Sequence, residues 1–304
     1  MENTIYDSII IGGGPAGMTA ALYLLRAGKK PLIIEKEAFG GQIAESPKLE
    51  NFPSVKSISG MDFSSNLFDQ ITDLGAEFEL EECTSVTKED GIFHVKTNYG
   101  EHLGKTVIVA AGCKHRKLGL EDEARLTGKG ISYCAVCDGA FYAGKDVLLI
   151  GDANTALQYA IMLAETCRKV TIVTLFDHFF ADDILIKKLD GINNIEIHHC
   201  LNAKKFLGDT SLTGVVFENT ETHETVQFAC DGCFVAIGQV PANEPYAELV
   251  DLEKGFIKTD ETMATKTPGL FAAGDCRVKG MRQVITATND AAIAAMSAVS
   301  LLNK

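Results

Sequence analysis

Two stretches of the chain share one order of apolar and polar positions. Each begins with a short apolar run, continues through a glycine-containing turn and a segment with helical spacing, and ends in a second apolar run. The resulting strand, helix and strand ranges are 6–11, 15–30 and 32–35 in the first stretch, and 146–150, 154–167 and 169–174 in the second. This order is typical of βαβ units in nucleotide-binding folds. We therefore predict an α/β protein with two doubly wound, Rossmann-like domains of the three-layer ββα kind.

Further apolar runs place the domain boundaries. Strands are predicted over 105–111, 227–237 and 267–273. Joints rich in glycine or proline follow the first two of these runs, near Gly112 and at 238–241. We expect a discontinuous first domain, residues 1–114 and 242–304, with residues 115–241 inserted as the second.

The turn after the first strand carries a complete G-x-G-x-x-G motif, Gly12-Gly13-Gly14-Pro15-Ala16-Gly17. The first glycine permits a tight turn, the second lets the backbone approach a pyrophosphate, and the third allows close packing of helix on strand. Glu35 ends the following strand, where a carboxylate can bind ribose hydroxyls. Together these features predict a dinucleotide site, with a purely structural turn as the alternative.

A dithiol lies inside the second domain, in Cys134-Ala135-Val136-Cys137-Asp138. Two cysteines at this spacing can close a disulfide, and the motif favours a reactive thiolate. The neighbouring carboxylate can handle the proton that thiol exchange requires. A zinc site shared with Cys230 and Cys233 is the alternative, but paired zinc motifs lie much closer together in sequence. We expect no metal, and we expect Cys230 and Cys233 to be structural residues on opposite faces of one strand, with an accessory thiol role as the alternative.

Charge and cysteine content narrow the class of protein. The formal net charge of −13 argues against a nucleic-acid partner and against binding to an anionic membrane surface. We see no apolar run near the roughly 18 residues of a membrane span and no signal sequence. Most of the nine cysteines are interpreted as buried small residues in a reducing compartment, so we expect a cytoplasmic protein.

Several further segments complete a resemblance to a known family. Gly40-Gly41-Gln42 follows Glu35, and a strand near the C-terminus ends in Gly274-Asp275. With the glycine motif and Cys134-Ala-Val-Cys-Asp138, these segments make the whole chain resemble the low-molecular-weight flavoprotein thioredoxin reductases. The resemblance implies an FAD site made by the following residues: Gly12, Gly14, Pro15, Ala16, Gly17, Glu35, Gly40, Gly41, Gln42, Asn51, Ala111, Gly112, Gly274, Asp275, Arg282, Gln283 and Val284.

The same resemblance assigns roles to the dithiol. It implies that Cys137 lies beside the flavin, that Cys134 attacks the disulfide of thioredoxin, and that Asp138 is the acid and base. It also implies a homodimer and a second domain that swings between two orientations.

The second glycine motif departs from the family pattern. It reads Gly151-x-Ala153-x-x-Ala156, with Asp152 beside the expected pyrophosphate position. The family's His-Arg-Arg cluster and its later arginine, which bind the 2′-phosphate of NADPH, are replaced by Thr174-Leu175-Phe176 and Phe180. Two like charges about 5 Å apart repel by roughly 3 kcal/mol at an effective dielectric of about 20. We therefore do not expect NADPH to bind, and only Asp177 remains to contact the ribose of NADH.

These departures resemble a ferredoxin-dependent branch of the family, so we expect reduced ferredoxin as the electron donor and thioredoxin as the substrate. Residues 114–117, Lys-His-Arg-Lys, are a candidate docking patch for ferredoxin, with a solvated hinge as the alternative. Two other functions stay open. One is a thioredoxin reductase that uses NAD(P)H through an atypical site, and the other is a flavin-bound redox sensor or binding module.

Overall fold

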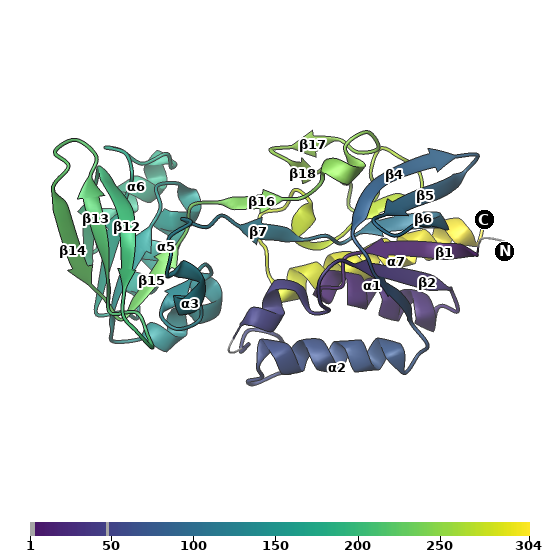
Figure 1. Cartoon of the computed structure of the whole chain (residues 1–304), viewed down its shortest axis with the longest axis horizontal. Helices are drawn as coiled ribbons and strands as arrows, with labels where there is room; N and C mark the ends of the chain where they lie inside the picture. Colours follow the sequence, from purple (N-terminus) through teal and green to yellow (C-terminus); the bar gives the residue numbers. More distant parts are fainter. Residues whose placement is uncertain (1–3, 47–48) are drawn as a thin grey trace. The chain divides into compact units, whose positions relative to one another are not determined.

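The computed structural model describes residues 4–46 and 49–304, and the chain forms two compact units (Figure 1). Unit 1 comprises Met1–Lys114 and Val240–Lys304, and unit 2 comprises His115–Gln239. The chain crosses between the units at two short strands that pair with each other, β7 (Cys113–His115) and β16 (Gln239–Pro241). The return at residue 240 lies close to the expected residue 242.

Unit 1 is built on a sheet in the order β3-β2-β1-β6-β5-β4, with β19 also paired to β6. Strands β3, β2, β1, β6 and β19 are parallel to their neighbours, whereas β4 and β5 form an antiparallel hairpin on β6. The strands of the unit 1 sheet are β1 (Ile5–Ile11), β2 (Pro31–Glu35), β3 (Glu77–Leu80), β4 (Cys83–Glu89), β5 (Ile92–Thr97), β6 (Glu101–Val109) and β19 (Leu270–Ala272). Its other elements are α1 (Pro15–Arg26), η1 (Gly41–Glu45), α2 (Gly60–Thr72), η3 (Glu244–Tyr246), β17 (Leu252–Glu253), β18 (Phe256–Ile257), η4 (Gly274–Cys276) and α7 (Val284–Leu302).

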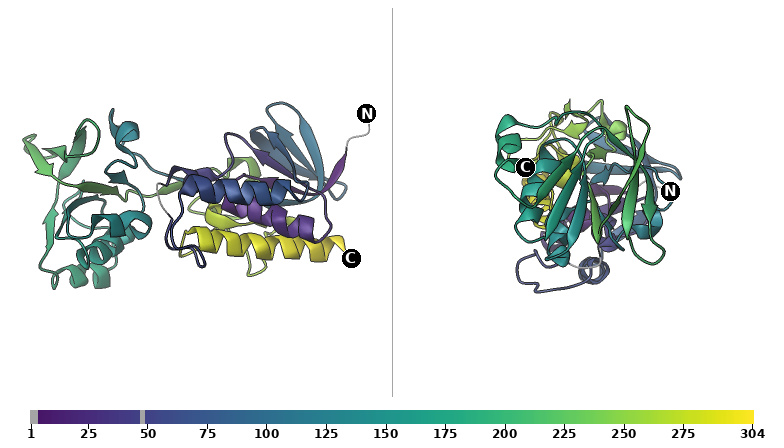
Figure 2. Two further views of the ribbon diagram at one scale, coloured as in Figure 1. Left: turned by 90° about the horizontal axis from the view of Figure 1, so that it is seen from below. Right: turned by 90° about the vertical axis from the view of Figure 1, so that its left-hand side faces the viewer.

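Alternation along the strands produces the layers of unit 1. Ile10 of β1 faces one core with the helices, while Ile9 and Ile11 face a second core with the β4–β5 hairpin. Helices α1, α2 and α7 cover the first face of the sheet (Figure 2). Alanines predominate where α1 meets α7, and small side chains let the two helices approach closely.

Unit 2 repeats this plan on a smaller scale. Its parallel sheet has the order β11-β10-β9-β15-β8, and a separate antiparallel sheet has the order β12-β13-β14. Its strands are β8 (Ile131–Ser132), β9 (Asp146–Ile150), β10 (Lys169–Val173), β11 (Ile195–His198), β12 (Leu201–Leu207), β13 (Gly214–Asn219), β14 (Thr225–Ala229) and β15 (Gly232–Val235). Its helices and 3-10 turn are α3 (Glu123–Leu126), α4 (Ala135–Asp138), η2 (Gly139–Tyr142), α5 (Asn154–Ala164) and α6 (Asp183–Leu189). The predicted α/β fold with two Rossmann-like units is confirmed.

One predicted strand is wrong. The run 227–237 divides into β14 and β15, which belong to different sheets. The turn between them is pinned to the start of β9, where the Asp231 amide donates to the Asp146 carbonyl and the Asp146 amide donates to Asp231 Oδ2. Cys230 and Cys233 therefore do not lie on opposite faces of one strand. Both are buried in the same apolar cluster of unit 2.

Helix α7 qualifies the expectation that no segment could span a membrane. Within the described part of the chain, α7 alone has the length and apolar composition of such a segment, and a third of it is buried. Ala291, Ala294 and Ala298 are fully buried in the core that α7 shares with α1. The apolar residues on the buried face of α7 are thus explained by its place in unit 1.

Candidate active site

The first glycine motif forms a tight turn at the start of α1. Gly12 has a φ of 114°, and a Cβ there would overlap the Ala110 carbonyl. A Cβ on Gly17 would overlap the carbonyl of Gly12. Gly14 by contrast has only backbone atoms 3.9 Å away and caps α1, followed by Pro15 at the first helical position. The turn thus leaves the helix N-terminus open to an anion, as a pyrophosphate site requires.

Glu35 and the segment after it hold this turn in place. Glu35 Oε2 accepts the Gly13 amide at 2.6 Å, and Oε1 accepts the Glu37 amide at 2.9 Å. The Gly40 amide donates to the Gly13 carbonyl at 2.9 Å. Gly41 has a φ of 59° and packs directly on Gly14. The structure therefore brings the predicted residues 12–17, 35 and 40–41 together at one end of the sheet.

A third segment joins them through the strand that follows β6. Gln42 donates through Nε2 to the Cys113 carbonyl. Gly112 has a φ of 66°, and the backbone of Ala111 and Gly112 lies within hydrogen-bonding reach of the Cys276 thiol. Burial raises the pKa of Cys276 to about 12, so this cysteine is a structural thiol.

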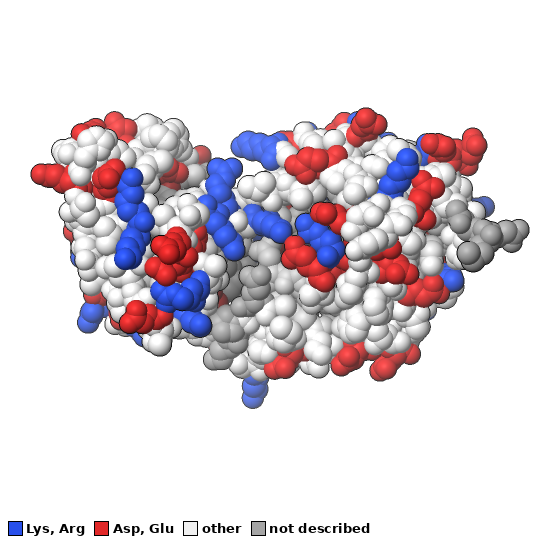
Figure 3. Space-filling model, viewed as in Figure 1, with Lys and Arg blue, Asp and Glu red and all other residues white. Residues whose placement is uncertain are grey.

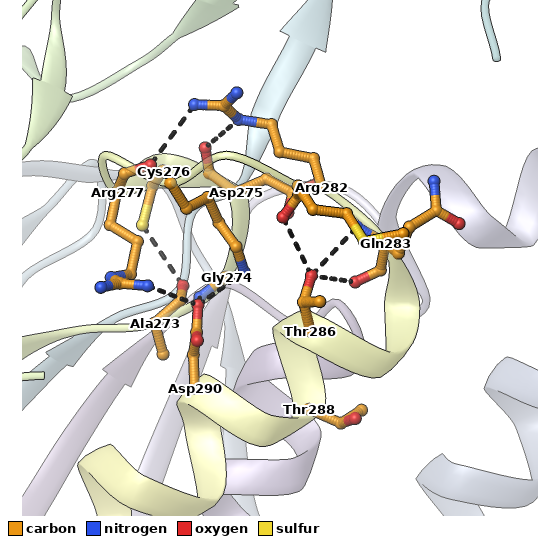
Figure 4. A network of polar contacts seen from close by, with 12 residues as sticks. Ala273, Gly274, Asp275, Cys276, Arg277, Arg282, Gln283, Thr286, Thr288 and Asp290 are labelled. Carbon is orange, nitrogen blue, oxygen red and sulfur yellow. Dashed lines mark hydrogen bonds and ion pairs between the residues drawn. The ribbon is translucent and has the colours of Figure 1, made fainter. Parts of the chain in front are cut away.

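The C-terminal segment presents a buried carboxylate to the same end of the sheet (Figure 4). Gly274 has a φ of 80°, and a Cβ there would lie 3.0 Å from the Cβ of Ala16, so the turn abuts the first glycine motif. Burial raises the pKa of Asp275, and Lys279 and Arg282 partly offset this rise. Asp275 Oδ1 is buried without a hydrogen-bond partner among the described residues. A buried acceptor of this kind fits a ligand hydroxyl.

The last predicted FAD residues surround the start of α7. Arg282 donates to the Asp275 carbonyl at 3.3 Å and stacks over the ring of Phe256 at 4.1 Å. Gln283 caps α7 through a capping box with Thr286. Asn51 Nδ2 donates to Gln283 Oε1 at 2.9 Å, which brings two distant predicted residues into contact. Val284 is the first residue of α7.

Sequence reasoning missed a buried ionic network next to this turn. Asp290 Oδ2 accepts the Gly274 amide at 3.2 Å, Arg277 Nη1 at 3.3 Å and Lys279 Nζ at 2.7 Å. The side chains of Asp290 and Lys279 are 5% and 7% exposed. A lone aspartate on the alanine-rich face of an apolar helix was the available signal, because a buried carboxylate requires partners.

The dithiol of unit 2 forms a disulfide between Cys134 and Cys137. Cys134 caps the short helix α4, and its sulfur accepts the Cys137 amide at 3.2 Å. Asp138 ends α4, and Ser132 Oγ donates to its Oδ2 at 2.6 Å. Burial raises the pKa of Asp138, and the Ser132 hydrogen bond partly offsets this rise. A carboxyl group with a raised pKa is a suitable proton donor for thiol exchange.

The second glycine motif keeps its turn, and the loop after β10 is bonded to it. A Cβ on Gly151 would lie 2.6 Å from the Ala236 carbonyl, so glycine is required there. The Phe180 amide donates to the Asp152 carbonyl at 2.7 Å. Asn154 and Asp182 exchange two hydrogen bonds of 3.0 and 2.8 Å. The loop after β10 is thus tied to the turn, and it brings a carboxylate to the start of α5.

The side chains at 174–176 and 180, where the resemblance implies basic residues, are apolar or already hydrogen-bonded. Thr174 is 1% exposed, and its hydroxyl bonds to the Phe176 carbonyl and to His199 Nδ1. Leu175, Phe176 and Phe180 are 44%, 46% and 57% exposed. The ring centroids of Phe176 and Phe180 lie 5.2 Å apart. The positions at which the resemblance implies a basic cluster therefore carry exposed aromatic surface.

Asp177 bonds to His178 at 2.6 Å, and this contact lowers the pKa of Asp177. The carboxylate stays charged and already has a partner in the neighbouring histidine.

The candidate docking patch is less basic than its sequence suggests. His115 stacks on Tyr133, and burial lowers the pKa of His115, so its ring is neutral. Lys114 pairs with Glu37 at 3.5 Å. On the face drawn in Figure 3, basic and acidic side chains are interspersed. Among residues 4–46 and 49–304, no three His, Cys, Asp or Glu side chains are grouped to hold a metal ion.

Comparison with known proteins identifies the family. The family model described as pyridine nucleotide-disulphide oxidoreductase matches residues 6–291. The chain belongs to this family. A thioredoxin reductase of Treponema pallidum is 38% identical over 304 residues, which is 99% of this chain and 98% of the relative. A thioredoxin reductase of Bacillus subtilis is 39% identical, over 97% of this chain and 94% of the relative.

Comparison with solved structures also finds thioredoxin reductases. A crystal structure of thioredoxin reductase from Streptococcus pyogenes aligns with a TM-score of 0.95 and 35% identity, covering 99% of each chain. The resemblance to low-molecular-weight thioredoxin reductases is confirmed, and the protein is a flavin-dependent disulfide oxidoreductase.

Proposed function

We propose that this protein transfers electrons from reduced ferredoxin to the disulfide of thioredoxin, through FAD and the Cys134–Cys137 pair. The supporting observation is a contrast within unit 2. The dithiol keeps its half-buried acid Asp138, whereas the loop after β10 has no basic side chains at positions 174–176 and 180 and is bonded to the nucleotide turn.

The residues proposed to hold FAD are those that unit 1 gathers at one end of its sheet. Gly12, Gly14, Pro15 and Gly17 offer the pyrophosphate turn, and Glu35 offers a carboxylate for the ribose. Asp275 offers a buried oxygen that has no partner in the described part of the chain. The remaining proposed contacts are Ala16, Gly40, Gly41, Gln42, Asn51, Ala111, Gly112, Gly274, Arg282, Gln283 and Val284. Bound FAD supplies the conversion from single electrons to the pair that a disulfide needs.

The dithiol chemistry follows from thiol exchange. The Cys134 thiolate attacks one sulfur of the thioredoxin disulfide, and a mixed disulfide forms while the other sulfur leaves as a thiolate. Asp138 gives its proton to that leaving thiolate. The Cys137 thiolate then attacks Cys134 Sγ, the internal disulfide reforms, and the second thioredoxin sulfur leaves and takes a proton from water. Two electrons pass to thioredoxin in each cycle.

Ferredoxin is an adequate donor energetically. A plant-type ferredoxin near −400 mV and thioredoxin near −270 mV differ by about 130 mV. For two electrons, this difference corresponds to roughly 6 kcal/mol in the favourable direction. Residues 114–117 remain the proposed docking patch, with Arg116 and Lys117 as its exposed charges.

Anaerobic flavin spectroscopy tests the donor. The purified holoprotein is mixed in turn with reduced ferredoxin, NADPH and NADH, and bleaching of the visible flavin band is recorded. We expect bleaching by ferredoxin alone and recovery after addition of oxidised thioredoxin. Rapid bleaching by a nicotinamide would establish the NAD(P)H-dependent alternative. Bleaching without transfer to thioredoxin would favour a flavin-bound redox sensor.

We also propose that the protein is a homodimer formed through the exposed face of α1 and α7. Tyr23 of α1 and Met296 of α7 are 41% and 48% exposed. They line one surface hollow together with Ile293 and small side chains of α7. An apolar hollow on an otherwise charged protein is typical of a surface that a second subunit covers.

A further inference from the structure

The hydroxyl of Ser132 connects the two ends of the redox motif. Ser132 ends strand β8, two residues before Cys134, and is 5% exposed. Its Oγ accepts the Cys134 amide at 3.1 Å and lies 2.6 Å from Asp138 Oδ2. One buried side chain therefore contacts both the backbone of the attacking cysteine and the carboxyl group of the proposed acid.

The direction of these hydrogen bonds follows from the acceptors within reach of the Ser132 hydroxyl. A serine hydroxyl has one proton to donate. The Cys134 carbonyl lies 3.4 Å from Oγ, so the carboxylate oxygen at 2.6 Å is the better acceptor. The carbonyl oxygen of a neutral carboxyl group is a stronger acceptor than its hydroxyl oxygen, so donation from Ser132 to Oδ2 favours the proton of Asp138 on Oδ1. Oδ1 is the buried oxygen that has no partner within the described parts of the chain.

We propose that Ser132 is a positioning residue that directs the exchangeable proton of Asp138 to Oδ1. This inference rests on the proposed role of Asp138 as the acid of disulfide exchange. Ser132 itself exchanges no proton with substrate; it fixes the carboxyl group and the Cys134 amide in one arrangement.

The surroundings of Ser132 suit this role. Strand β8 pairs in parallel with β15, where Ser132 is opposite the fully buried Phe234. The carboxyl group of Asp138 is therefore held by a hydroxyl on a packed strand. Tyr142, on the following turn η2, is a titratable group close enough to Asp138 for the charge of Asp138 to raise its pKa. Burial, assisted by that charge, raises the pKa of Tyr142 to about 12, so the phenol stays neutral. Leu163 and Met162 of α5, which pack at Gly139, are apolar.

The test uses two disulfides that differ in their need for a proton. Holoprotein is reduced with dithionite, freed of excess reductant, and mixed anaerobically with oxidised thioredoxin or with dithiobis-nitrobenzoate. The nitrobenzoate thiolate leaves readily without protonation because its pKa is low. For Ser132→Ala we expect a roughly tenfold slower reaction with thioredoxin, part of the 10²–10⁴ that general acid catalysis typically contributes. The reaction with dithiobis-nitrobenzoate should keep its wild-type rate.

The pH profile gives a second readout. Loss of a hydrogen bond to the charged carboxylate should move the descending limb of the thioredoxin reaction upward by about 1 to 2 pH units. Ser132→Thr, which keeps the hydroxyl, should restore the wild-type limb. In an Asp138→Asn background, Ser132→Ala should have no further effect on the rate. Ser8→Ala, which removes a buried hydroxyl from β1 in unit 1, should change neither reaction.

Several results would overturn the inference while leaving the proposed function intact. They are an unshifted pH limb in Ser132→Ala, equal slowing with both disulfides, or an additive effect in the Asp138→Asn background. If Ser132→Ala loses the fold, infrared difference spectra of wild type against Asp138→Asn decide the question. A carboxyl C=O band at the frequency of a free carbonyl would contradict the Ser132 bond, and a lowered frequency would support it. Failure of reduced wild type to react with thioredoxin at all would instead reject the proposed function.

Discussion

Two aspartates carry the main chemical features of this protein at the scale of single residues. Asp138 in unit 2 and Asp275 in unit 1 each bury one carboxylate oxygen without a partner among the described residues. Burial raises the pKa of both groups. Since an unpaired buried carboxylate is costly, each marks a place where another group, a thiolate or a ligand hydroxyl, is expected during function.

The raised pKa of Asp138 predicts a pH-dependent stability difference. A carboxyl group with a raised folded-state pKa stabilises the fold most when it is protonated, and this contribution is lost as pH rises through the folded-state pKa. The amide side chain introduced by Asp138→Asn does not ionise. The stability of this variant relative to wild type should therefore increase as pH rises from about 4 to 7. Urea unfolding of both oxidised proteins across this range measures the difference, and a constant difference would contradict the raised pKa.

Most of the candidate site residues could be predicted from the sequence, because their residue types form short motifs along the chain. The overlap that a Cβ would cause at Gly12 or Gly17 is the physical basis of the glycine motif. The dithiol and Asp138 are neighbours along the chain. Asp290 and Ser132 were not readable in this way, because their partners come from other turns and strands.

At the scale of elements, the buried ions at the start of α7 are the least expected feature. Asp290 bonds to the Gly274 amide and to two cations, so it ties α7 to the turn that presents Asp275 (Figure 4). The network therefore fixes one edge of the proposed FAD site through a helix.

Removing the Asp290 charge should be strongly destabilising. Asp290→Asn removes the carboxylate that bonds to both Lys279 and Arg277, and breaking a buried ion pair typically costs about 3 to 5 kcal/mol. Chemical denaturation of the FAD-free protein measures this loss directly. Asp251→Asn is a matched control, because Asp251 is 63% exposed and pairs with Lys266 on the surface. The control should stay within about 0.5 kcal/mol of wild type, and equal losses in both variants would show that burial is not the cause.

The apolar loop after β10 predicts that added charges would change which nucleotide the protein binds. Replacing Leu175, Phe176 and Phe180 by arginine supplies charged donors for a 2′-phosphate, each worth about 1.5 to 3 kcal/mol. Two successful contacts would tighten NADPH binding by roughly a hundredfold or more. Isothermal titration with NADPH and NADH tests this, and NADH, which lacks the phosphate, is the matched control ligand. Unchanged NADPH affinity would mean that the contacts between the loop and the turn, Phe180 with Asp152 and Asp182 with Asn154, prevent binding, and not the missing charges.

Element boundaries show where sequence patterns stop being informative. The helix predicted over 15–30 ends at Arg26, because Gly28 adopts a φ of 70° and turns the chain. The run 227–237 looked continuous because both of its halves are apolar, yet Cys230 and Asp231 divide it. That division depends on a contact with β9, which is distant in sequence and invisible to a periodicity argument.

At the scale of the whole molecule, the two units repeat one architecture, but the glycine turn before the first helix is open in one unit and bonded to a loop in the other. The turn of unit 1 keeps an open helix N-terminus at Gly14. The turn of unit 2 is bonded to its neighbouring loop through Asp152 and Phe180. A single fold thus serves cofactor binding in one unit and presentation of the dithiol in the other.

The proposed dimer predicts a simple change of mass. Met296→Lys places a charge in the apolar hollow of α1 and α7 and should convert the protein to a monomer at micromolar concentration. Light scattering after size-exclusion chromatography reports the mass. Met61→Lys on α2 is the matched control, since Met61 is 61% exposed and lies outside the hollow. A wild-type protein that already elutes as a monomer would reject the proposed interface.

The split of unit 1 in the sequence also sets an order of events during synthesis. Strand β19 and helix α7, which complete the sheet and the helical layer of unit 1, are translated after all of unit 2. Unit 2 can therefore fold on the ribosome while Ile10, Leu24 and Ile108 still lack the helix that covers them. Asp275 and the start of α7 emerge among the last segments, so the proposed flavin site is completed late in synthesis. Until then the nascent chain exposes an apolar surface that a chaperone can recognise.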